Sequence, residues 1–213
     1  MLIIFDWDGT LCDSTGRIVA AMQAAAAGAG VVVPSREAVR DVIGLGLPEA
    51  MADLFPTLEL AARDDMRARY SRCYVELDSE PAGLFPGAME TMLGLRERGH
   101  GLAVATGKGR AGLNRVLAGL GLERFFDATR CADETRSKPH PRMVHELLDE
   151  LEVGATESLV VGDSEYDLKM ASAARVASVG VSYGVHDRER LGQHKPLAVL
   201  DHLEELLALE ILA

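Results

Sequence analysis

The sequence predicts an α/β protein with a doubly wound parallel sheet and an all-helical cap inserted after the first strand. Short apolar runs recur along the 213 residues, and amphipathic helical patterns separate them, which is typical of a parallel sheet. The stretch between the first run and about residue 84 contains helical patterns but no convincing strand. We therefore expect an α/β core of residues 1–14 and 85–213 and a helical cap of residues 15–84.

The first expected strand is the apolar run Leu2–Phe5, and two carboxylates, Asp6 and Asp8, follow it at once. An apolar run without alternation is typical of a strand buried on both faces. Because side chains alternate along an extended chain, Asp6 and Asp8 are expected to project the same way. Two carboxylates that close repel each other unless a cation or a shared proton compensates them. Mg²⁺ would do so and suits phosphate chemistry, although the pair could instead cap the following turn.

The expected cap contains an alanine-rich helical stretch and an amphipathic stripe that runs from Met66 to Leu77. Its expected linkers are Cys12–Gly16 and Glu80–Gly87, the latter carrying two prolines and two glycines. The tripeptide Gly44-Leu45-Gly46 could be a loop that enters the functional site or a simple turn between helices.

The remaining chain alternates between strands and helices. Strands are expected at Gly101–Ala105, Phe126–Cys131, Ser158–Val161, Val176–Val181 and Leu197–Val199. Helices are expected after Pro86-Gly87, around Leu113–Leu120 and around Val144–Leu151, where apolar residues recur at i, i+3, i+4 and i+7.

Three further polar positions are expected at the same edge of the sheet as Asp6 and Asp8. Thr106 and Asp163 each follow an expected strand, and Lys138 precedes a crossover helix. Taken singly, each has an ordinary explanation: helix capping for Thr106-Gly107, a solvated loop for Lys138, and helix N-terminal acids for Asp163 and Asp167. In an open α/β sheet, however, ligands bind outside the carboxyl ends of the strands, so these residues can converge on one rim.

With these motifs, the chain resembles the phosphatase branch of the haloacid dehalogenase superfamily along its whole length. Residues 6–14 (DWDGTLCDS) resemble the first motif of that family, and Thr106, Lys138-Pro139 and Gly162–Asp167 resemble the second, third and fourth. Its overall pattern is most similar to phosphoglycolate phosphatase-like proteins. One departure is Arg175, which stands where relatives with this fourth motif usually carry glycine.

The resemblance implies a magnesium-dependent phosphomonoester hydrolase that works through an aspartyl-phosphate. Asp6 would be the nucleophile, and Asp8 would be the general acid and then the general base. The resemblance assigns Mg²⁺ to Asp6, to Asp8 through its backbone carbonyl, to Asp163, and to Asp167 directly or through water. It assigns the phosphoryl oxygens to Thr106, Gly107 and Lys138, while Lys108 could face the substrate or be an exposed lysine at a helix start.

A small phosphorylated metabolite is the expected partner, with 2-phosphoglycolate as the leading candidate. A sugar-phosphate mutase of the same superfamily is the alternative, since it also needs both acids. A catalytically silent binding or regulatory module is the alternative from a different class; loss of Asp6, Asp8 or Lys138 would be its signature, and all three are present.

Composition excludes several other classes. The formal charge of −11 argues against a nucleic-acid partner. No apolar stretch approaches the roughly 20 residues of a membrane span, and no signal peptide is evident, so a cytoplasmic location is the default expectation. The three cysteines are widely spaced and are expected to be reduced thiols. We expect a monomer or a weak dimer.

Overall fold

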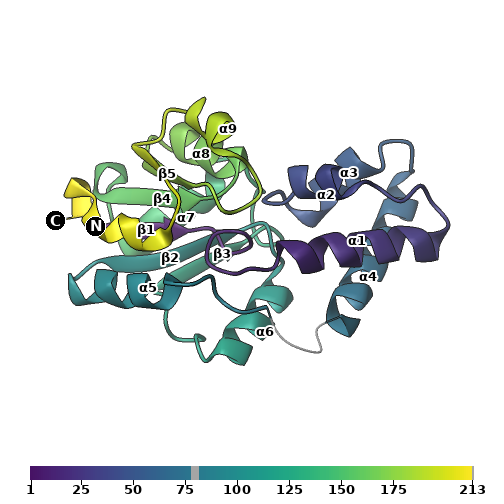
Figure 1. Ribbon diagram of the computed structural model, residues 1–213, viewed down its shortest axis with the longest axis horizontal. Helices are drawn as coiled ribbons and strands as arrows, with labels where there is room; N and C mark the ends of the chain where they lie inside the picture. The colour runs from purple at the N-terminus through teal and green to yellow at the C-terminus, as the bar shows by residue number, and fades with distance from the viewer. Residues whose placement is uncertain (78–81, 213) are drawn as a thin grey trace.

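The computed structural model describes residues 1–77 and 82–212 and contains a six-stranded parallel sheet (Figure 1). The strand order is β3-β2-β1-β4-β5-β6, which places the first strand of the chain near the centre. The strands are β1 (Leu2–Phe5), β2 (Gly101–Thr106), β3 (Ala128–Cys131), β4 (Ser158–Gly162), β5 (Ala177–Val181) and β6 (Ala198–Leu200). The predicted α/β fold class is therefore confirmed.

The observed strands match the expected ones to within one or two residues at each end. The largest difference is at β3, which begins at Ala128 rather than at Phe126. Phe126 instead packs edge-on against Trp7, with ring centroids 6.2 Å apart, and so belongs to the core beneath the sheet.

Helices cover both faces of the sheet. They are α5 (Ala88–Glu97), α6 (Arg110–Leu120), α7 (Arg142–Leu151), α8 (Glu165–Ala173) and α9 (Arg188–Gly192), with short 3₁₀ turns η1 (Ala155–Glu157), η2 (Leu203–Ala208) and η3 (Glu210–Leu212).

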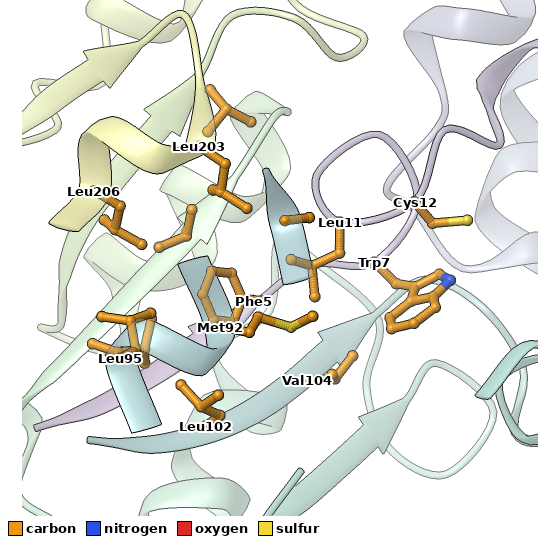
Figure 2. Packing of buried hydrophobic residues seen from close by; sticks show 14 of the residues in the cluster. Phe5, Trp7, Leu11, Cys12, Met92, Leu95, Leu102, Val104, Leu203 and Leu206 are labelled. Carbon is orange, nitrogen blue, oxygen red and sulfur yellow. The ribbon is translucent and has the colours of Figure 1, made fainter. Parts of the chain in front are cut away.

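Residues of β1 alternate between two hydrophobic clusters, as the unbroken apolar run predicts. Ile3 and Phe5 pack with α5 and η2 on one face, and Figure 2 shows Phe5 beside Met92 of α5. Leu2 and Ile4 pack with α7 and α8 on the other face. Burial on both faces fixes the strand so that the residues after Phe5 emerge at a defined point of the sheet edge.

Beside the sheet lie four helices, α1 (Thr15–Ala29), α2 (Arg36–Asp41), α3 (Leu47–Leu54) and α4 (Leu60–Glu76) (Figure 1). They share a hydrophobic cluster of their own, in which Met22 of α1, Met51 of α3 and Met66 of α4 take part. These helices fall in the segment that the sequence assigns to the cap; its bounds stay a prediction, and Glu80 and Pro81 of the expected second linker lie outside the described residues.

Arg175, the departure from the family pattern, adopts the left-handed conformation with φ 60°. The turn after α8 is thus kept although the residue is not glycine, at a backbone cost of about 1 kcal/mol. In the described part of the chain, no helix combines the length and the hydropathy needed to cross a membrane.

Candidate active site

The carboxyl ends of three adjacent strands bring the polar motifs together. Asp6 follows β1, Thr106 ends β2, and Asp163 follows β4. Phe5 is opposite Val104 on one side and opposite Val161 on the other, so the three strands end at the same level. The fold therefore gathers at one rim the residues that the sequence places at separate strand ends.

A buried lysine lies at the centre of this rim. Lys138 Nζ is 2.7 Å from Asp6 Oδ1 and 2.6 Å from Asp167 Oδ1, and all three side chains are at most 1% exposed. Burial by itself would lower the pKa of Lys138, but Asp167 and Asp6 raise it above its ordinary value. The two carboxylates thus favour the charged form of Lys138, which bridges the first and fourth motifs.

Three carboxylates surround this position and could hold a metal ion. One oxygen each from Asp6, Asp163 and Asp167 lies within 4.8 Å of the others, and all three residues are buried. Burial raises the pKa of Asp6 well above its ordinary value, and the charges of Asp167 and Asp163 raise it further, against the lowering effect of Lys138. Burial, together with Asp167, likewise raises the pKa of Asp163 to about 7. One lysine therefore leaves the cluster with unbalanced negative charge.

Each acid of this cluster is positioned by a specific set of contacts. Asp163 accepts hydrogen bonds from the Thr10 hydroxyl and from the Val185 backbone N–H, both at 2.8 Å. A Cβ on Gly9 or Gly184 would come within 2.2 Å of Asp163 Oδ2, so these glycines allow the backbone to close around the carboxylate.

Asp167 serves the helix and the site at the same time. Its Oδ2 accepts hydrogen bonds from the Ser164 hydroxyl at 2.6 Å and the Ser164 N–H at 3.2 Å, which forms a capping box at the start of α8. Its Oδ1 faces Lys138. The helix-capping explanation and the functional explanation of this residue therefore both hold.

Asp8 is separate from the acid cluster, although both Asp6 and Asp8 line the same cavity. Its Oδ1 accepts a 2.6 Å hydrogen bond from the Ser14 hydroxyl and lies 3.0 Å from Lys108 Nζ. The sequence suggests one cation compensating both acids; in the structure each acid pairs with its own lysine. A metal role for Asp8 through its backbone carbonyl stays a prediction.

Lys108 is a functional candidate that the sequence left open. Its side chain is only 10% exposed, and its Nζ lies 4.9 Å from the ring centre of Tyr74 on the cap. Burial would lower the pKa of Lys108, but the neighbouring Asp8 raises it above its ordinary value. The only sequence signal for this role is its place directly after Thr106-Gly107.

The cap contacts the core at the second motif. The carbonyl oxygens of Gly44 and Leu45 lie so close to Gly107 that an added Cβ would be 2.7 and 2.4 Å from them. Gly46 N–H donates a 2.6 Å hydrogen bond to the Ser137 hydroxyl, next to Lys138. Of the two readings of Gly44-Leu45-Gly46, the structure therefore favours the loop that enters the site.

Gly107→Ala is expected to push this cap loop away from the second motif. Because backbone oxygens cannot move aside as a flexible side chain does, kcat/KM should fall by at least about tenfold while the fold is retained. Steady-state kinetics with circular dichroism would check this. Gly83→Ala, where an added Cβ has open space, is the control. Equal kinetics of Gly107→Ala and wild type would contradict the close approach of the Gly44 and Leu45 carbonyl oxygens to Gly107.

Asp6, Asp8, Thr106, Gly107 and Lys108 line one cavity of about 680 Å³ between the sheet and the cap. Helix α4 contributes Arg67, Tyr70, Ser71 and Tyr74 to its wall, at the i, i+3, i+4 and i+7 spacing of one helix face. Arg67 and Ser71 are thus on the cavity side of the cap.

Comparisons with known proteins agree with this arrangement. Residues 3–181 match the family model described as haloacid dehalogenase-like hydrolase. The chain is 34% identical to the protein named probable phosphatase IndB of Dickeya dadantii, over 97% of this chain and 91% of that protein. It is 31% identical to a phosphoglycolate phosphatase of Vibrio parahaemolyticus, over 97% and 94% of the two chains.

Solved structures show the same architecture. A crystal structure described as a predicted phosphoglycolate phosphatase from Haemophilus somnus superposes with a TM-score of 0.88 at 25% identity, covering 97% of this chain and 96% of that one. A hydrolase from Pseudomonas syringae gives a TM-score of 0.88 at 23% identity, with 97% and 95% covered, which shows the shared fold.

Proposed function

The chain belongs to the haloacid dehalogenase-like hydrolase family, and from that premise we propose that it is a magnesium-dependent phosphomonoesterase that works through an aspartyl-phosphate. It is an enzyme of the phosphatase class, as its curated relatives are. The buried contact of Lys138 with Asp6 and Asp167, beside Asp163, carries the proposal, because Asp6 also lines the cavity. Small phosphorylated metabolites are its proposed substrates, with 2-phosphoglycolate among them because several relatives are named for it.

The acid cluster fits a divalent cation. Asp6 Oδ2 is buried and has no hydrogen-bond partner among the described residues, which leaves an oxygen ligand available. Asp6, Asp163 and Asp167 supply the oxygen donors that Mg²⁺ prefers. When bound, Mg²⁺ would neutralise the carboxylates and polarise the phosphoryl group.

Asp6 and Asp8 share the bond-making steps. An Asp6 oxygen bonds to phosphorus while the bond between phosphorus and the ester oxygen breaks, and Asp8 gives its proton to that oxygen. Lys108, 3.0 Å away, then stabilises the carboxylate that Asp8 becomes. In the second step Asp8 takes a proton from water as the water oxygen bonds to phosphorus, and the Asp6 carboxylate is released.

Lys138, Thr106 and Gly107 stabilise the phosphoryl oxygens in this proposal. Lys138 is fixed by its two carboxylate partners, and Thr106 is fully buried, so neither group has to reorganise during the reaction. Preorganised charge of this kind supplies much of the barrier reduction in phosphoryl transfer. The acidic chain is proposed to act in the cytoplasm as a monomer or weak dimer, with no nucleic-acid or membrane partner.

Phosphate release from a panel of phosphomonoesters, with and without Mg²⁺, tests this function. We expect release that needs Mg²⁺ and stops with a chelator, because the metal offsets the unbalanced negative charge of the acid cluster. Turnover that chelators leave unchanged would contradict the metal, and no release from any ester would favour a silent binding module. Interconversion of hexose-phosphate isomers without phosphate release would favour a mutase.

A further inference from the structure

We propose that the preferred substrate of this phosphatase is a phosphomonoester whose alcohol has an apolar body, such as an aromatic ring or a longer alkyl chain, larger than glycolate. The inference rests on the proposed function, because it concerns the leaving group of the same reaction. It is carried by the size of the cavity, by the residues that line its cap side, and by the docked position of the cap.

The cavity is large for a two-carbon alcohol. Its volume of about 680 Å³ falls in the range of roughly 300–1,000 Å³ that holds drug-sized ligands. Apart from the residues of α4, its cap wall is mainly apolar and comes largely from α1, from α3 and from the segment between α2 and α3. These residues include Ile18, Met22, Val42, Leu47, Pro48 and Ala50. Water beside such apolar walls forms few hydrogen bonds with them. An apolar substrate body that displaces this water therefore gains binding free energy.

The space does not result from a cap that stands away from the core. Gly46 of the cap is hydrogen-bonded to Ser137 of the core at 2.6 Å. The Tyr166 hydroxyl donates to the Asp41 carbonyl at 2.9 Å, and Arg40 donates to the Gly184 carbonyl at 2.8 Å. Since the cap is docked, the substrate has to fill the space that remains.

The cations in the lining already have partners. Lys108 pairs with Asp8, and Arg67 pairs with Asp64 at 2.8 Å. The guanidinium of Arg115 packs over the Tyr74 ring at 5.5 Å. A glycolate carboxylate would have to compete for these groups, whereas an apolar body needs no such exchange.

The aromatic part of the wall lies where the leaving group has to go. Lys108 contacts both Asp8, the proposed acid for the ester oxygen, and the Tyr74 ring. Tyr70 and Tyr74 pack together with ring centres 5.9 Å apart, and both line the cavity. The alcohol that leaves phosphorus with the proton of Asp8 therefore extends along two aromatic rings, which favours a planar or aliphatic body.

A series of esters with similar leaving-group acidity tests the inference. Phosphate release is measured with Mg²⁺ for ethyl, butyl, hexyl and benzyl phosphate, together with 2-phosphoglycolate. We expect kcat/KM to rise along the alkyl series, up to about fourfold for each methylene, and by at least about tenfold from ethyl to hexyl. Benzyl phosphate is expected to exceed 2-phosphoglycolate as well.

A variant pair ties the preference to the cavity. Ala111 is exposed at the start of α6 and lines the cavity, so Ala111→Phe fills space without disturbing the core. It should lower kcat/KM for benzyl phosphate relative to ethyl phosphate by at least about fivefold. Ala118→Phe, at an exposed position of the same helix outside the lining, should leave that ratio at the wild-type value.

The outcomes separate the two proposals. A flat or falling alkyl series, or 2-phosphoglycolate as the best substrate, overturns the inference and leaves the phosphatase function standing. An unchanged ratio in Ala111→Phe also overturns it. No release from any ester, including the small ones, overturns the function itself and with it the inference.

Discussion

Asp6→Asn is expected to abolish phosphate release, with kcat lower by a factor on the order of 10⁴ or more. The amide is a poor nucleophile, and loss of the attacking group in covalent enzymes has effects of this size. Phosphate release at saturating Mg²⁺ measures it. Asp13→Asn removes an exposed carboxylate of the same segment and is the control, with turnover expected within about twofold of wild type.

The same variant should be more stable than the wild type when metal is absent. The raised pKa of Asp6 means that its charged form costs folding free energy, and this cost grows as the pH rises above the ordinary carboxyl range. Asparagine carries no charge, so the metal-free variant gains most at alkaline pH. Thermal unfolding with a chelator, compared at about pH 6 and about pH 8, measures this gain. Normal turnover in Asp6→Asn would remove the basis of the aspartyl-phosphate mechanism.

Among the substitutions considered, Lys138→Met is expected to cause the largest loss of unfolding free energy, together with a loss of activity. It leaves Asp6 and Asp167 buried without their cation, and breaking a buried ion pair from one side costs about 3–5 kcal/mol of unfolding free energy. Removing a preorganised cation from the phosphoryl site should also lower kcat by roughly 10²–10³-fold. Denaturant unfolding and steady-state kinetics measure the two effects.

Lys169→Met is the matched control for that experiment. Lys169 also pairs with a carboxylate, Glu165 at 2.9 Å, but its side chain is 43% exposed, so its loss should cost no more than about 1 kcal/mol. The instability of Lys138→Met should shrink at low pH, where protonation of Asp6 and Asp163 relieves their repulsion. If Lys138→Met were as stable as the wild type at neutral pH, Lys138 would not hold the acids in place.

The strands and the rim of the sheet were accessible from the sequence because both depend on local patterns. An unbroken apolar run indicated β1, and the polar residues after β1, β2 and β4 were expected to meet at one edge. Membership of the haloacid dehalogenase-like hydrolases was indicated by the same four motifs and is confirmed by the family match over residues 3–181. The roles of individual residues stay predictions for the experiments above.

The partners of the side chains were not accessible in this way. The side chains of Asp6 and Asp8 are expected from the sequence to project the same way. In the structure, however, Asp6 pairs with Lys138 and Asp8 pairs with Lys108. The burial of Lys108 depends on α4 of the cap, whose residues are remote in sequence from the second motif. The same holds for the hydrogen bond of Thr10 to Asp163, 153 residues further along the chain.

Hydrophobic periodicity and the direction of parallel strands were enough to predict the α/β core, the helical segment after β1 and the edge at which the acids gather. The pairing of each lysine with its acid, and the size and apolar character of the cavity, could be learned only from the folded chain. Those properties arise from packing between distant segments, where the positions of side chains rather than the local pattern set the contacts.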